Sequence, residues 1–451
     1  MAASMVDGLA YEERLTAEAL LGFIKESPSM FHTVRAIRLR LDEAGFVYLP
    51  EVRPWECEPG GSYYTVRNNS SIIAFKVGSD VRPACCHFQI AASHSDSPTF
   101  KLKANSALEG PGPYARLNVE AYGGMIDYTW FDRPLSVAGR VLVETENRIE
   151  SKLVSLDDAV AIIPSLAIHM DHGVNSGFAP NRKVDLCPLF SAGELFAGAF
   201  DELLAERLGV QPQQMLGRDV FLVNRQEPMI WGAEDEFISA PKLDDLMCAY
   251  ASLDAFLHSS NPGSVSVFCC FDNEEVGSNT MQGALSTFLP DTLQRLNVAL
   301  GGTDEMYRRA LAASMLVSCD NAHAVHPNHP EKCDEGNRAF LNRGIVVKEA
   351  ANQKYCTDAF SRAIFCAVCN NAGVPFQRFA NRSDMAGGST LGNLSNQQAS
   401  IHGVDVGCAQ LAMHSAYETA GTRDVLLAVR AIRAFYDADL DITSCDGATL
   451  R

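Results

Sequence analysis

The strongest constraint on the fold is a repeated alternation of strand patterns with helical patterns. Short apolar runs rich in β-branched residues recur at Ser71–Val77, Phe88–Ala92, Val265–Phe271, Met315–Ser318 and Ile345–Lys348. Helical patterns occur between or after several of these runs, at Leu246–Leu257, Cys356–Asn370 and Thr422–Tyr436. Strands alternating with helices are typical of an α/β domain. The sequence therefore predicts an α/β fold in which helices flank a mixed central sheet.

One long stretch, from about Leu102 to Ala233, has a different pattern. It is rich in Gly and Pro and contains short alternating segments, such as Tyr114–Tyr122 and Val137–Glu144. Its main helical pattern is Ala192–Arg207. We therefore expect a β-rich domain of residues 102–233, inserted into an α/β domain made of residues 1–101 and 234–451.

The charge and the cysteines limit the class of protein. The formal net charge is −18 over 451 residues, which argues against nucleic acid or an anionic membrane as the main partner. The sequence contains no run of 18 apolar residues, so we expect no transmembrane helix. The acidic Met1–Leu15 does not resemble a secretory signal. The single CxxC, Cys366 and Cys369, lacks the second pair of a zinc clip. Free thiols in a reducing cytoplasm are the expectation.

Five segments place a metal-ligand type of residue close after an apolar run. They are Ala91–Pro98, Ser239–Asp245, Phe271–Ser278, Ser318–Pro327 and Leu411–Ser415. In an open α/β sheet the carboxyl ends of strands converge on one crevice, so residues distant in sequence can share a site. The segments supply His94, Asp244, Glu275, Asp320 and His414, the imidazole and carboxylate ligands of zinc, cobalt or manganese.

The charges of this set fit two divalent ions. Three carboxylates against two such ions leave one positive charge, which favours a hydroxide bridging the metals as the nucleophile of a hydrolysis. In the pair Glu274-Glu275, one residue can bind metal while the other acts as general base. Asp96 follows His94 by two residues, on the same side of an extended segment, and can orient the His94 ring.

Each element also has an ordinary structural interpretation. A Glu-Glu pair is usually a solvated surface feature, and Asp244-Asp245 could cap a helix. His323, His326 and His329 could form a turn with exposed rings, and Gly387–Gly392 lacks the lysine of a phosphate-binding loop. The co-occurrence of five strand-end elements is what favours a metallohydrolase.

The same segments resemble the aspartyl aminopeptidases, a family of two-metal zinc-type exopeptidases, in a bacterial-type form. The similarity runs in order over nearly the whole chain and includes the strings Ala92–Pro98, Ile238–Asp244, Asp272–Ser278, Ala322–Asn328 and Gln410–Ser415. The Gly387–Gly392 segment departs from the pattern expected of the family, which commonly has a Cys or Ser with Gly-Thr there.

The resemblance implies a role for each site residue. His94, Asp244 and Asp320 would bind one ion, and Asp244, Glu275 and His414 the other, with Asp244 bridging. Glu274 would be the general acid/base. His323, Lys348 and Tyr355 match substrate-contacting positions. His169 would reach the active site of a neighbouring subunit and contact substrate or transition state, although a third histidine ligand is an alternative.

The expected activity is removal of an N-terminal Asp or Glu from peptides with free N-termini. A buried ammonium at Lys348 would pair with the acidic side chain, unless Lys348 instead extends to water. The resemblance also implies a large homo-oligomer, a dodecamer, assembled through the inserted domain. Two alternatives remain, namely an aminopeptidase that prefers neutral residues such as Leu, and an inactive assembly or cargo protein of the same fold.

Overall fold

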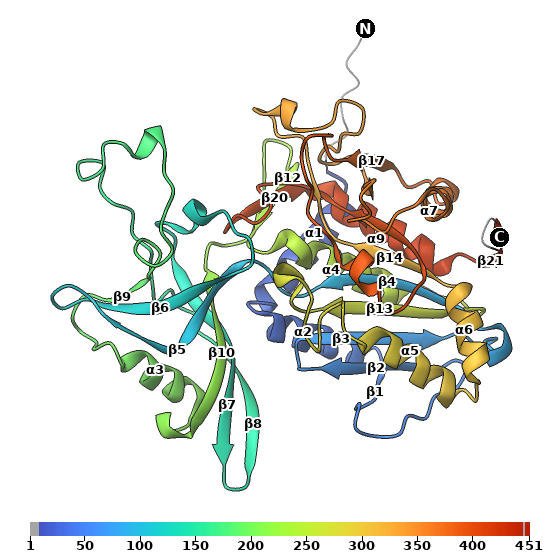
Figure 1. The fold of residues 1–451 in the computed structure, drawn as a ribbon, viewed down its shortest axis with the longest axis horizontal. Helices are drawn as coiled ribbons and strands as arrows, with labels where there is room; N and C mark the ends of the chain where they lie inside the picture. The colour runs from blue at the N-terminus through green and yellow to red at the C-terminus, as the bar shows by residue number, and fades with distance from the viewer. Residues whose placement is uncertain (1–8, 445–446) are drawn as a thin grey trace.

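The computed structural model describes residues 9–444 and 447–451, which form four sheets. Figure 1 shows two lobes, with a smaller sheet and one helix beside a larger sheet that carries most of the helices. None of the described helices is long and apolar enough to cross a membrane.

The larger lobe is built on a nine-stranded mixed sheet with the order β1-β2-β3-β13-β4-β14-β18-β16-β17. Its strands are β1 (Val47–Tyr48), β2 (Ser62–Arg67), β3 (Ser71–Val77), β4 (Phe88–His94), β13 (Val265–Phe271), β14 (Met315–Cys319), β16 (Ile345–Glu349), β17 (Phe376–Ala380) and β18 (His402–Gly407). The central strands β13, β4, β14 and β18 are parallel to their neighbours in that set. This confirms the predicted α/β class, with every predicted strand present.

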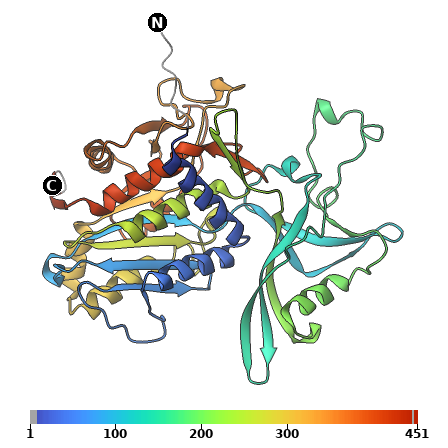
Figure 2. The same cartoon turned by 180° about the vertical axis from the view of Figure 1, so that it is seen from behind.

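Helices cover both faces of this sheet, as Figures 1 and 2 show from opposite sides. One layer contains α1 (Tyr11–Glu26), α2 (Met30–Glu43), α4 (Leu243–His258), α7 (Ala359–Asn371) and α9 (Thr422–Asp437). The other contains α5 (Phe288–Ala299), α6 (Asp304–Ala312) and α8 (Leu391–Ser395). Along β13, Phe268 and Cys270 pack into the first layer while Val267, Cys269 and Phe271 pack into the second. A strand buried on both faces has no polar side, which is why β13 is apolar throughout.

The smaller lobe is a six-stranded sheet with the order β8-β7-β10-β5-β6-β9. Its elements are β5 (Thr99–Glu109), β6 (Ala115–Tyr122), β7 (Leu135–Thr145), β8 (Arg148–Ser155), β9 (Leu189–Ser191), β10 (Met215–Asn224) and α3 (Ala199–Leu208). Phe200 and Leu204 of α3 pack on Val141 and Leu222 in a core separate from the two layers of the larger lobe. All pairings in this sheet are antiparallel.

A third sheet of five strands, in the order β11-β12-β20-β19-β15, completes the crevice. It contains β11 (Met229–Trp231), β12 (Phe237–Ala240), β15 (Ala322–His323), β19 (Ala409–Leu411) and β20 (Glu418–Gly421). A hairpin of β21 (Leu440–Ser444) and β22 (Gly447–Leu450) follows α9. The chain passes from the end of β4 directly into β5, so the carboxyl ends of the central strands face the smaller lobe (Figure 1).

Candidate metal centre

Three of the expected site segments lie at adjacent ends of the central strands. His94 is the last residue of β4 and pairs in register with Phe271, the last residue of β13. Glu274 and Glu275 follow β13 in a single 3-10 turn, and Asp320 follows β14 on the other side of β4. The parallel register therefore brings side chains from positions 94, 275 and 320 to one edge of the sheet.

The other two segments belong to the five-stranded sheet. Asp244 lies between β12 and the regular part of α4, with φ −85° and ψ 106°, which is not helical. His414 lies in the connection between β19 and β20, in the left-handed region with φ 67°. Both residues thus occupy irregular backbone between regular elements, where a side chain can be directed into the crevice.

The five expected ligands converge. His94 Nε2 lies 3.5 Å from Asp244 Oδ1, and His414 Nε2 lies 3.4 Å from Asp244 Oδ2. His414 Nε2 is also 3.4 Å from Glu275 Oε2. Three groups of ligand atoms, each within 4.8 Å of one another, are His94–Asp244–Asp245–Asp320, Asp244–Glu275–His414 and His94–Glu274–Glu275. The first two share Asp244, with one carboxylate oxygen toward each histidine.

Hydrogen bonds hold both imidazoles with Nε2 toward the carboxylates. His94 Nδ1 lies 3.1 Å from the Asp96 carbonyl oxygen and 3.4 Å from its Oδ1. His414 Nδ1 lies 2.6 Å from the carbonyl oxygen of Gly124, in the smaller lobe. A carbonyl can only accept, so each Nδ1 donates and each Nε2 is the nitrogen that faces the carboxylates, where a metal ion would bind.

Asp96 organises the turn that carries the paired glutamates. Its Oδ1 accepts from the Glu274 backbone N–H at 3.1 Å, and its Oδ2 accepts from the Glu275 N–H at 3.1 Å. The Tyr122 hydroxyl donates to Oδ2 at 2.7 Å. Asp96 is 1% exposed, so the buried carboxylate is fully supplied with donors.

The electrostatics of the site favour a bound cation. Burial raises the pKa of Asp320 to about 6 and that of Glu274 to about 8, and it also raises the pKa of Glu275 well above its ordinary value. Within the described residues, Asp244 Oδ1, Asp245 Oδ1 and Glu275 Oε1 are buried without a hydrogen-bond partner. Buried carboxylates that lack donors are costly unless a positive charge accompanies them. The donor set of imidazole nitrogen and carboxylate oxygen fits divalent zinc, cobalt or manganese.

Lys348 has its partners within the protein. It is 2% exposed, and its ammonium donates to the carbonyl oxygens of Asp320 at 2.7 Å and Asn321 at 3.2 Å. Its Nζ also lies 3.7 Å from Asp320 Oδ1 and 5.2 Å from the centroid of the Tyr355 ring. The side chain therefore does not extend to water, and Asp320 is its ion-pair partner within the protein.

His323 and Tyr355 lie near Lys348 at this end of the crevice. The Tyr355 side chain is buried, with its hydroxyl 3.4 Å from Asn381 Nδ2. His323 is open to solvent on β15, with its ring 6.3 Å from that of Phe379.

The structure does not bring His169 to the cluster. It is exposed in the connection between β8 and β9, and its ring lies 6.3 Å from that of His172. No candidate metal group among the described residues contains it. Cys366 and Cys369 are free thiols of α7, and no candidate metal group among the described residues contains them.

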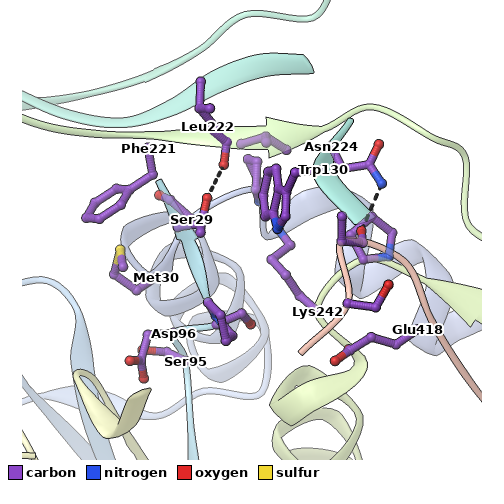
Figure 3. A pocket seen from close by; sticks show the side chains of 18 residues that line it. Ser29, Met30, Ser95, Asp96, Trp130, Phe221, Leu222, Asn224, Lys242 and Glu418 are labelled. Atoms are coloured by element: carbon purple, nitrogen blue, oxygen red, sulfur yellow. Dashed lines mark hydrogen bonds between the residues drawn. The ribbon is translucent and has the colours of Figure 1, made fainter. Parts of the chain in front are cut away.

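Three residues at the site were not expected from the sequence. Asp245 joins the first ligand group, Tyr122 binds Asp96, and Glu418 is buried behind Asp244 and His414. Figure 3 shows Asp96 and Glu418 along the lower side of a pocket whose upper side includes Trp130 and Asn224 of the smaller lobe. Asp245 was visible as part of an acidic pair, whereas no local pattern marks Tyr122 or Glu418.

An α/β sheet with two histidines and several buried carboxylates gathered at its strand ends is typical of a metal-dependent hydrolase. Residues 23–436 match the model of one family, described as the aminopeptidase I zinc metalloprotease (M18) family. A probable M18 family aminopeptidase 2 of Clostridium novyi is 42% identical over 430 residues, covering 93% of this chain and 98% of that relative. The chain belongs to the M18 family of zinc metalloproteases and is an aminopeptidase.

Solved structures agree in fold. The Ape4 chain of an Ape4–Nbr1 complex superposes with a TM-score of 0.91 at 35% identity, covering 94% of this chain and 86% of that one. A Saccharomyces cerevisiae mApe1 dodecamer gives a TM-score of 0.82 at 28% identity, covering 95% and 97%. The family resemblance drawn from the sequence motifs is thereby confirmed.

Proposed function

We propose that the protein binds two divalent ions and removes N-terminal Asp or Glu from peptides. His94, Asp244 and Asp320 would hold one ion, and Asp244, Glu275 and His414 the other. The two groups of converging ligand atoms that share Asp244 carry this assignment. Zinc is the ion we propose first, because the family is one of zinc metalloproteases, while the same ligands accept cobalt or manganese.

Bound ions would polarise the scissile carbonyl and make water acidic enough to attack near neutral pH. Glu274 would take the proton from the attacking water and return it to the leaving amine nitrogen. Its backbone is fixed by Asp96, and its carboxylate belongs to neither proposed ligand set. Burial raises the pKa of Glu274 to about 8, the direction that suits a group that must both accept and donate a proton.

The acidic preference rests on the positive side of the crevice. Lys348 is engaged with Asp320, so we propose that it acts on substrate through its field, while the exposed His323 and the adjacent Tyr355 line the place where an acidic side chain would lie. Chromogenic Asp, Glu and Leu substrates compared side by side test this proposal. Faster hydrolysis of Leu would favour the neutral-preferring alternative. Absence of bound metal on elemental analysis would favour the inactive assembly protein.

We propose that residues 102–233 form an assembly domain of a cytoplasmic homododecamer. Large apolar side chains are exposed around His169, namely Leu166 at 65%, Ile168 at 47% and Met170 at 75%. Such clustering is typical of a protein interface, and the similar mApe1 is a dodecamer. Burial against a neighbour would also carry His169 toward that neighbour's crevice. Light scattering after gel filtration tests this, and a monomer at working concentration would contradict it.

A further inference from the structure

Glu418 is a buried acidic residue that the proposed mechanism does not use. It is the first residue of β20, is 1% exposed, and lines the pocket between the two lobes in Figure 3. It pairs in register with Ala240, the last residue of β12, just before Asp244. Its carboxylate lies behind the candidate metal centre and outside the two proposed ligand sets.

The Glu418 carboxylate joins the backbones of two proposed ligands. Its Oε2 accepts a hydrogen bond from the Asp244 backbone N–H at 3.0 Å, and its Oε1 accepts from the His414 N–H at 2.6 Å. Gln410 Nε2 donates to Oε1 at 3.3 Å. All three partners are donors, so both oxygens of the Glu418 carboxylate serve as acceptors at this position.

Neither the Asp244 N–H nor the His414 N–H would find an acceptor in a helix or sheet if Glu418 were absent. Asp244 lies at the start of α4, where the first N–H groups of a helix have no intrahelical acceptor. His414 has φ 67°, a left-handed conformation that is unfavourable for a non-glycine residue and persists only where the surrounding structure holds it. The connection between β19 and β20 is therefore held in this conformation partly by the bond to Glu418.

We infer that Glu418 is a positioning residue, which sets the spacing of Asp244 and His414 and thereby the affinity for the ion that they share. This inference rests on the proposed ligand assignment. The 3.4 Å between His414 Nε2 and Asp244 Oδ2 is a distance between two chain segments 170 positions apart, and one carboxylate spans them from behind. Residues that orient metal ligands typically contribute about 10–100-fold to metal affinity.

The test compares wild type, E418Q and D424N as full-length proteins. E418Q keeps the shape but turns an N–H donor toward one of the backbone N–H groups. D424N is the matched control, because Asp424 is also a fully buried carboxylate that accepts two backbone N–H bonds, from Asn342 at 2.6 Å and Gly344 at 2.9 Å. Each protein is dialysed against a series of chelator-buffered zinc concentrations, and bound zinc is measured by elemental analysis.

We expect wild type and D424N to bind two ions with the same affinities, and E418Q to bind one of the two about 10–100-fold more weakly. Activity of E418Q should then require correspondingly more zinc. Superimposable zinc-binding curves for E418Q and wild type would overturn the inference. If E418Q does not fold, E418D is tested in its place, because it keeps the carboxylate on a shorter side chain. We expect E418D to lose zinc affinity at the same ion, by a smaller factor.

The same data separate this inference from the proposed function. A wild type that binds one ion would overturn the two-ion proposal. The role of Glu418 would then stand if E418Q weakened that single ion more than D424N does, and would fall if the two variants were equal.

Discussion

Replacing Tyr122 by Phe removes one hydroxyl from the hydrogen bonds that support the Glu274–Val276 turn. This hydroxyl donates to Asp96 Oδ2 at 2.7 Å and accepts from Asn273 Nδ2 at 2.8 Å. Burial, followed by the charge of Asp96, raises the pKa of Tyr122, so the group remains a donor at any working pH. The change leaves the ring and its edge-to-face contact with Phe221 in place.

The size of the expected fall in kcat follows from the hydrogen bonds that Asp96 keeps in Y122F. It retains the backbone N–H groups of Glu274 and Glu275 and loses one bond to an ionised acceptor, worth about 1.5–3 kcal/mol. That range corresponds to about 10–150-fold in an equilibrium or rate ratio, and only the part felt in the transition state reaches kcat. We therefore predict a fall in kcat of about 10-fold, with about 100-fold as the upper limit.

The assay is steady-state kinetics on an N-terminal Asp substrate, with zinc content and thermal midpoint measured on the same preparations. Y307F is the matched control, since Tyr307 is 3% exposed and its hydroxyl donates to the Pro290 carbonyl oxygen at 3.2 Å, away from the site. Y307F should lose stability but not kcat. Wild-type kcat and zinc content in Y122F would refute the claim that the smaller lobe supports the Glu274–Val276 turn and its proposed general base.

Three further outcomes are expected. E274Q should keep its zinc and lose about 10²–10⁴-fold in kcat; wild-type turnover would exclude Glu274 as the base. Burial, then the charges of Lys242 and Arg35, lower the pKa of His32 to about 4, so the folded state resists protonation and stability should be lost as pH falls below about 6.5. The loss amounts to about 2 kcal/mol by pH 5, and thermal midpoints at pH 7 and pH 5 should differ less in H32Q than in wild type. Co-expression of H169A with E274Q should yield hybrid oligomers more active than either parent if His169 acts across a subunit boundary, and no gain would confine it to its own chain.

The parts of the site that could be predicted are those that local sequence encodes. His94, Glu275 and Asp320 each follow an apolar strand, and parallel register alone brings such positions together. The strands were recognisable because their burial on both faces makes them continuously apolar. Helix boundaries were less accurate, since the pattern at Ala192–Arg207 predicted a helix that begins only at Ala199 in α3.

The parts that could not be predicted depend on contacts between segments with no shared pattern. Glu418 is found only by asking where the Asp244 and His414 N–H groups go, and Lys348 only by finding its partner Asp320. A sequence shows that an acidic or basic residue is present. It does not show which distant backbone group or side chain will bind that residue in the fold. Tyr122 is similarly one of several aromatic residues of a β-rich stretch until Asp96 lies opposite its hydroxyl.

These contacts bear on what the smaller lobe does. The segment after β6 supplies the Gly124 carbonyl to His414 Nδ1, and the Ile126 N–H donates to the His414 carbonyl at 2.9 Å. With Glu418 on its N–H, His414 is thus held at three points, two of them from the smaller lobe. A lobe used solely for assembly would have no need to bind a ligand of the opposite sheet in the same chain. The smaller lobe therefore helps to shape the candidate metal centre of its own subunit, whatever it contributes to a neighbour.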